Sequence, residues 1–164
     1  MDTERTVHTA GKTSGEDSFI EQFARLVEQE GGPRIAGRIA ALLLLSPQAL
    51  PLDDIAERLR ASKASVSTNA RMLEQWGLLE RASRPGDRRD YYQARADAAV
   101  KLLERRLEWM NRLRAAADVG AESAAAGHPV VRERLATLCR LHGFAQRNVE
   151  RTLRRMRQAA GRSD

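Results

Sequence analysis

Apolar residues three and four positions apart recur along most of the chain and predict a mainly helical protein. These stripes predict helices over residues 18–30, 33–45, 52–60, 62–76, 100–113 and 130–159. Breaks such as Gly31-Gly32 and Ser46-Pro47 separate the stripes, as is typical of helix ends. The last helix would be about 45 Å long at 1.5 Å per residue. Its apolar positions come close to a heptad rhythm.

The helical period is interrupted once, in the middle of the chain. Residues 78–83 alternate weakly and predict a strand, 84–87 predict a Pro-Gly turn, and 89–94 predict the return strand. The adjacent Tyr91 and Tyr92 should point to opposite faces of that strand. We expect one to pack beneath the hairpin. The other is left open between packing and reaching a phosphate or an effector pocket.

The helix before the hairpin has two separable faces. At 100° per residue, Val66, Ala70 and Leu73 fall on one side and should pack inward. The opposite side is small, polar and basic. An ordinary exposed amphipathic helix would carry Glu and Lys there, yet no acid occurs from Ser62 to Arg71. This face therefore predicts a helix that lies close to base edges in DNA.

The order of short helix, tight turn, helix and two-stranded hairpin is that of a winged helix-turn-helix, whose second helix enters the major groove. In the hairpin, or wing, arginines suit the narrow minor groove. Asp87 should orient Arg89 or a backbone N–H of the turn. The predicted DNA contacts are Ser62, Lys63, Ser65, Ser67, Thr68 and Arg71 on the helix, and Arg84, Arg88 and Arg89 on the wing.

Charge agrees with this placement but does not prove it. The net charge of +6 divides into −4 over residues 1–59, +4 over 60–95, zero over 96–130 and +6 over 131–164. A basic block thus coincides with the predicted helix-turn-helix and wing, which indicates a polyanionic partner. Only three of the 28 basic residues are lysines, so a GC-rich genome is an alternative source of the arginines.

The residues from Asp53 to Ala94 resemble the DNA-binding core of the MarR superfamily, and most of all its GbsR-like branch. The resemblance rests on Ser62-Lys63, Ser65-Val66-Ser67, Leu73, Trp76-Gly77-Leu78 and the run from Pro85 to Tyr92. It implies a homodimeric transcriptional regulator, usually a repressor, that dimerises through its N- and C-terminal helices. It leaves room for a small-molecule effector of unknown identity. One departure is Arg60, where such turns often have glycine; a positive φ there would strain an arginine.

Other chemistry is less well supported. Cys139 and His142 lie one helical turn apart, but three histidines and one cysteine in the chain are too few for a convincing metal site. An aromatic cage of Trp109, Tyr91 and Tyr92 for a quaternary ammonium ligand is a weak alternative, because aromatic residues are 4% of the chain. We expect no enzyme activity, no cofactor and no metal.

The expected fold is therefore mainly α, a winged helix-turn-helix with a two-stranded wing and added terminal dimerisation helices. The expected division is a disordered tail over 1–17, a DNA-binding domain over 18–95 and a helical dimerisation region over 96–164. No apolar run is long enough to cross a bilayer and the N-terminus lacks a secretory signal, so we expect a cytoplasmic protein. The function predicted is binding of double-stranded DNA at a pseudo-palindromic operator. The alternative is a winged helix that binds a protein.

Overall fold

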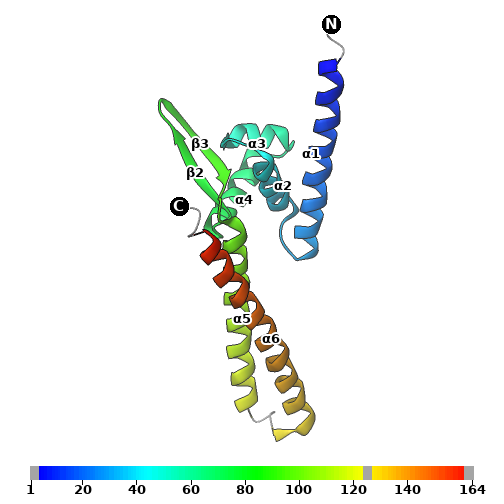
Figure 1. The fold of residues 1–164 in the computed structure, drawn as a ribbon, viewed down its shortest axis with the longest axis vertical. Coiled ribbons are helices and arrows are strands. Elements are labelled where there is room, and N and C mark those ends of the chain that lie inside the picture. Colours follow the sequence, from blue (N-terminus) through cyan, green and yellow to red (C-terminus); the bar gives the residue numbers. More distant parts are fainter. Residues whose placement is uncertain (1–3, 124–126, 161–164) are drawn as a thin grey trace. The chain divides into compact units, whose positions relative to one another are not determined.

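A computed structural model describes residues 4–123 and 127–160, and it divides into two compact units, Met1–Ala98 and Ala99–Asp164. The first unit contains α1 (Glu4–Gln29), α2 (Arg34–Leu45), β1 (Leu50–Pro51), α3 (Leu52–Arg58), α4 (Lys63–Gln75), β2 (Leu79–Arg84) and β3 (Asp87–Ala94) (Figure 1). The fold is thus mainly helical with a small antiparallel sheet, as the sequence predicted.

The core of the first unit holds the helix-turn-helix together. Ile39 and Leu42 of α2, Ile55 of α3 and Val66 and Ala70 of α4 are fully buried in one apolar cluster. Val66, Ala70 and Leu73 are the buried residues of α4, which confirms the inward face predicted from the helical period. Because this face is packed on α2 and α3, the opposite face of α4 is left for solvent or a partner.

The sheet has three strands where the sequence predicted two. Its order is β1-β3-β2, with all neighbours antiparallel. In the added pairing Leu50 lies opposite Tyr92 and Pro51 opposite Tyr91. Two residues are too few for an alternating pattern, and a proline has no N–H to donate, so Pro51 fits only an edge strand. This is why the sequence did not predict β1.

Three helices end in the same backbone motif. After α4, the N–H of Leu78 donates to the carbonyl of Leu73 and that of Gly77 to Glu74. These two hydrogen bonds define a Schellman motif, in which the residue after the C-cap takes a left-handed conformation. Gly77 has a φ of 72°, and Gly31 has 83° at the same place after α1. The motif after α3 places Arg60 there instead, with a φ of 49°.

The first helix is longer than predicted. The sequence predicted a helix from residue 18 and a disordered tail over 1–17, whereas α1 begins at Glu4. The segment has no proline to interrupt the i to i−4 bonds, so the helix continues upstream of its apolar stripe. Residues 1–3 lie outside the described residues.

The second unit is a helical hairpin of α5 (Ala98–Glu122), which begins at the last residue of the first unit, and α6 (Pro129–Ala160). Figure 1 shows the two helices running antiparallel side by side. Arg157 of α6 forms an ion pair with Glu104 of α5 at 2.6 Å. Leu153 and Met110 are buried, but large apolar side chains on both helices stay exposed, including Trp109, Leu141 and Phe144. The predicted long last helix is confirmed.

Candidate nucleic-acid interface

The recognition helix α4 begins at a side-chain cap. Ser62 accepts a hydrogen bond at its Oγ from the backbone N–H of Ser65 at 3.2 Å, as expected of an N-cap serine. This bond shows that Ser62 stabilises the helix start. On the outer face Thr68 and Arg71 are exposed, whereas Ser65 and Ser67 are half-buried. The predicted helix contacts therefore share one side of α4 and differ in how far they reach into solvent.

Two cations of α4 have internal partners. Lys63 Nζ lies 2.8 Å from Asp53 Oδ1 of α3, and both side chains are more than half exposed. Arg71 donates from Nε to the backbone carbonyl of Ser67 at 3.3 Å, and its side chain stays on the surface. Surface ion pairs of this kind contribute little to stability, so Lys63 can exchange Asp53 for another anion.

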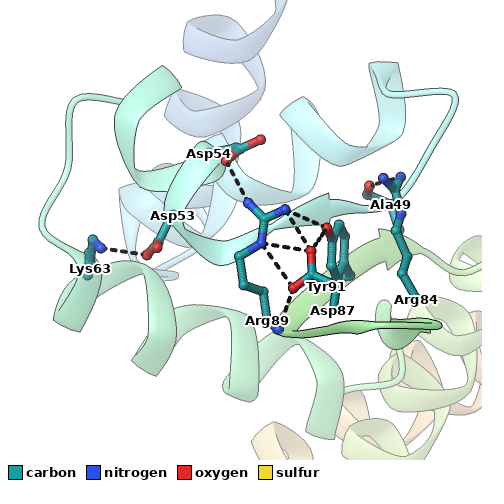
Figure 2. A network of polar contacts seen from close by, with 8 residues as sticks. All are labelled: Ala49, Asp53, Asp54, Lys63, Arg84, Asp87, Arg89 and Tyr91. Carbon is teal, nitrogen blue, oxygen red and sulfur yellow. Dashed lines mark hydrogen bonds and ion pairs between the residues drawn. The ribbon is translucent and has the colours of Figure 1, made fainter.

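The wing is organised by one carboxylate. Asp87 accepts hydrogen bonds from the backbone N–H of Arg89 at 2.9 Å, from the Arg89 guanidinium at 2.7 Å and from the Tyr91 hydroxyl at 2.7 Å (Figure 2). The guanidinium of Arg89, together with the Tyr91 hydroxyl, holds the pKa of Asp87 well below its usual range. The same pairing raises the pKa of Arg89. Both alternatives expected for Asp87, Arg89 and a turn N–H, occur together.

The three wing arginines are placed differently. Arg84 stacks on the Tyr91 ring, with its Cζ 4.5 Å from the centroid, and donates to the Ala49 carbonyl at 3.3 Å. Arg89 is occupied by Asp87, although about half of its side chain is exposed. The side chain of Arg88 is exposed and makes no hydrogen bond or ion pair with any part of the chain that the structure describes. Arg88 is therefore the wing cation that is free to meet a phosphate or a groove.

Both tyrosines are structural. Tyr91 is 2% exposed and Tyr92 1% exposed. The alternative that one of them reaches a phosphate or an effector pocket does not hold, because both side chains are buried. Tyr92 packs in the apolar core, and the Tyr91 hydroxyl donates to Asp87. Because neither buried tyrosine is open to a ligand, the two cannot line an aromatic cage.

The first turn of α3 connects the helix and the wing. Asp53 pairs with Lys63 of α4, and Asp54 lies 3.9 Å from the Arg89 guanidinium of β3 (Figure 2). From the sequence alone, the favourable helix dipole is enough to account for both carboxylates. Their cross-element pairing could not be seen there, because it depends on how α3 packs between α4 and the sheet.

In residues 4–123 and 127–160, no group of three or more His, Cys, Asp and Glu residues could hold a metal ion. His142 lies beside Trp109, with ring centroids 6.0 Å apart, and its Nδ1 is 3.0 Å from the Leu138 carbonyl. Cys139 is a half-buried free thiol. Among the same residues, no helix is long and apolar enough to span a membrane.

Comparison with known proteins points to one family. The sequence model of the MarR family matches residues 31–90, which include the helix-turn-helix and most of the wing. The transcriptional regulator MmpR5 of Mycobacterium tuberculosis is 34% identical over 147 residues, 89% of each chain. The putative regulator YvaV of Bacillus subtilis is 27% identical over 82 residues, 50% of this chain and 46% of its own. A crystal structure of a transcriptional regulator matches with a TM-score of 0.75 at 33% identity, covering 88% of this chain and 99% of that one.

Proposed function

Because the chain belongs to the MarR family of winged-helix transcriptional regulators, we propose that it is a homodimeric repressor that binds a pseudo-palindromic operator. The observation that carries DNA recognition is the outer face of α4, which has no acid in its first turn and keeps Thr68 and Arg71 exposed opposite a fully buried side. In such folds this helix reads the major groove. A DNA-binding regulator of this kind would act in the cytoplasm.

Exposed apolar side chains support a homodimer. Leu141 and Phe144 of α6 are more than 60% exposed, and Leu102 and Trp109 of α5 about half exposed. Large apolar side chains left exposed on both helices of a hairpin favour burial against a second copy. Two-fold symmetry would place the two recognition helices about one DNA turn, or 34 Å, apart.

We propose that the residues of the interface differ in what they contact. Ser65, Ser67, Thr68 and Arg71 would meet base edges or nearby phosphates, and Lys63, released from Asp53, would meet a phosphate. Arg88 would enter the minor groove beside the wing. Ser62 and Arg89 would act mainly by positioning, because the first caps α4 and the second is held by Asp87. Arg84 would likewise brace the wing against Ala49, the residue before β1.

A selection of duplexes from a random-sequence library, followed by binding at two salt concentrations, tests this function. We expect a selected duplex to show two-fold sequence symmetry. Arg71→Ala should change which duplexes are selected. Arg88→Ala should weaken binding to every duplex and lower the slope of log K against log salt by about 0.9. Arg25→Ala, which removes an exposed arginine of α1, is the matched control. Failure to enrich any sequence would refute the proposal.

The alternative function is a winged helix that binds a protein and not DNA. It predicts no enrichment from the library and no salt slope that depends on Arg71 or Arg88.

We further propose that the chain belongs to the GbsR-like branch, on the strength of the Ser62-Lys63 and Pro85–Tyr92 motifs. A small-molecule effector would act by favouring one arrangement of the two subunits over another. Release of the selected duplex by a candidate compound is the corresponding test.

A further inference from the structure

Arg60 stands where the backbone favours glycine. It follows the C-cap Leu59 of α3, and its N–H donates to the Glu57 carbonyl while that of Ala61 donates to Ala56. This is the same motif that has Gly31 after α1 and Gly77 after α4. At a φ of 49° the Cβ of an arginine crowds its own backbone, which costs about 1–2 kcal/mol in the left-handed region.

The fold gives Arg60 no compensating contact. Its side chain is exposed and makes no hydrogen bond or ion pair within the described residues. The basic residues on either side are paired, Arg58 with Glu16 at 2.7 Å and Lys63 with Asp53 at 2.8 Å. A cation at this end of α3 would favour the helix dipole, but Arg58 already supplies one in the last turn.

The position of Arg60 brings it to the start of the recognition helix. It lies two residues before the N-cap Ser62, so the two Cα atoms are at most about 7.6 Å apart. The first turn of α4 contains no acid. Backbone N–H groups at a helix start attract phosphates, and a free guanidinium close by can bind the same or the next phosphate.

We propose that Arg60 contacts a DNA phosphate beside the first turn of α4, as an additional member of the interface that rests on the proposed function. A backbone strain that the fold does not offset is then offset in the complex. The contact is to the phosphate chain and not to a base, since Arg60 lies outside the helix that enters the groove. It therefore adds affinity without sequence preference.

Three substitutions separate charge from backbone conformation. Arg60→Gly removes the strain and the charge, Arg60→Asn removes the charge but keeps a residue that tolerates the left-handed region, and Arg60→Lys keeps the charge. Each is measured for thermal unfolding and for binding to the duplex selected from the random library, at 50 and 200 mM salt. Arg25→Ala is the control for loss of one exposed arginine elsewhere.

We expect Arg60→Gly to raise the melting temperature by about 2–4 °C and yet to bind DNA more weakly. One lost phosphate contact lowers the salt slope by about 0.9. The ratio of wild-type to Arg60→Gly affinity should therefore shrink roughly threefold between 50 and 200 mM salt. Arg60→Asn should lose the same slope, and Arg60→Lys and Arg25→Ala should keep the wild-type slope.

Three results would overturn the inference. Wild-type binding by Arg60→Gly and Arg60→Asn at both salt concentrations would show that Arg60 does not touch DNA. A lower melting temperature for Arg60→Gly would show that arginine stabilises the turn itself. Loss of the slope in Arg60→Lys would show that charge is not the cause. Failure of the wild type to bind any selected duplex would instead refute the proposed function.

Discussion

Gly37 allows α1 and α2 to pack closely, and adding one methyl group there should destabilise the protein. A Cβ built on Gly37 would lie 2.7 Å from the Cα of Ala24 and 3.0 Å from the Cβ of Val27. Ala24 is completely buried. The crowded atoms belong to the backbone and the root of a side chain, so they cannot move away without shifting one helix against the other.

The size of the effect follows from two opposing terms. Overpacking of a close contact costs about 1–3 kcal/mol, and replacing glycine by alanine in a helix gains about 0.5–1 kcal/mol. Gly37→Ala should therefore lower the free energy of unfolding by about 1–2 kcal/mol, since the 2.7 Å contact with the Ala24 backbone places the cost in the upper part of its range. For a chain of this length each kcal/mol corresponds to about 2–4 °C in melting temperature.

Gly15→Ala is the matched control. Gly15 lies inside α1, and an added Cβ there meets nothing within 4 Å. It should gain only the helix propensity, so the melting temperature should rise. Both variants are measured by thermal unfolding at one protomer concentration, because self-association would make the midpoint depend on concentration. A Gly37→Ala protein as stable as the wild type would refute the close packing of α1 on α2.

Three further predictions concern the charges of the wing and of α3. Asp53→Asn should tighten DNA binding by up to about fivefold, because it frees Lys63 and removes a negative charge from the interface; Glu57→Gln on the same helix is the control, and unchanged affinity would contradict the idea. Because the pKa of Asp87 lies below that of a free carboxyl, its stabilisation of the wing is complete above about pH 4 and is lost as the pH falls. The protection factors of the β2–β3 amides, which correct for the intrinsic pH dependence of hydrogen exchange, should therefore fall on acidification. Tyr91→Phe removes one donor and should raise the carboxyl pKa in an NMR titration; an unchanged pKa would mean that the hydroxyl does not bind Asp87.

Periodic features of the fold were predictable from the sequence, and pairings between distant segments were not. The buried stripe of Val66, Ala70 and Leu73 follows from a period of 3.6 residues that any helix must obey. The Pro-Gly turn of the wing follows from local backbone preferences. By contrast β1 consists of two residues whose strand character comes entirely from their partners Tyr91 and Tyr92.

The same division explains the outcome for individual side chains. Asp87 and Arg89 are two residues apart, so their pairing was expected and is confirmed. Arg84 contacts Ala49, which is 35 residues away, so its bracing role could not be predicted. The positive φ of Arg60 was recognisable only by comparison with the glycine that such turns often have, and the structure confirms it.

Pairing within the fold also changes how the basic block should be understood. Of the cations predicted to bind DNA, Lys63 and Arg89 each have a carboxylate partner, and Arg84 is stacked on Tyr91. A phosphate that binds Lys63 must replace Asp53. The loss of the Lys63–Asp53 attraction therefore offsets part of the Coulomb energy gained with the phosphate. Among the described residues, Arg60, Arg71 and Arg88 have no carboxylate partner to lose. Counting the basic residues alone therefore overstates the attraction to DNA, and these three arginines should dominate its salt dependence.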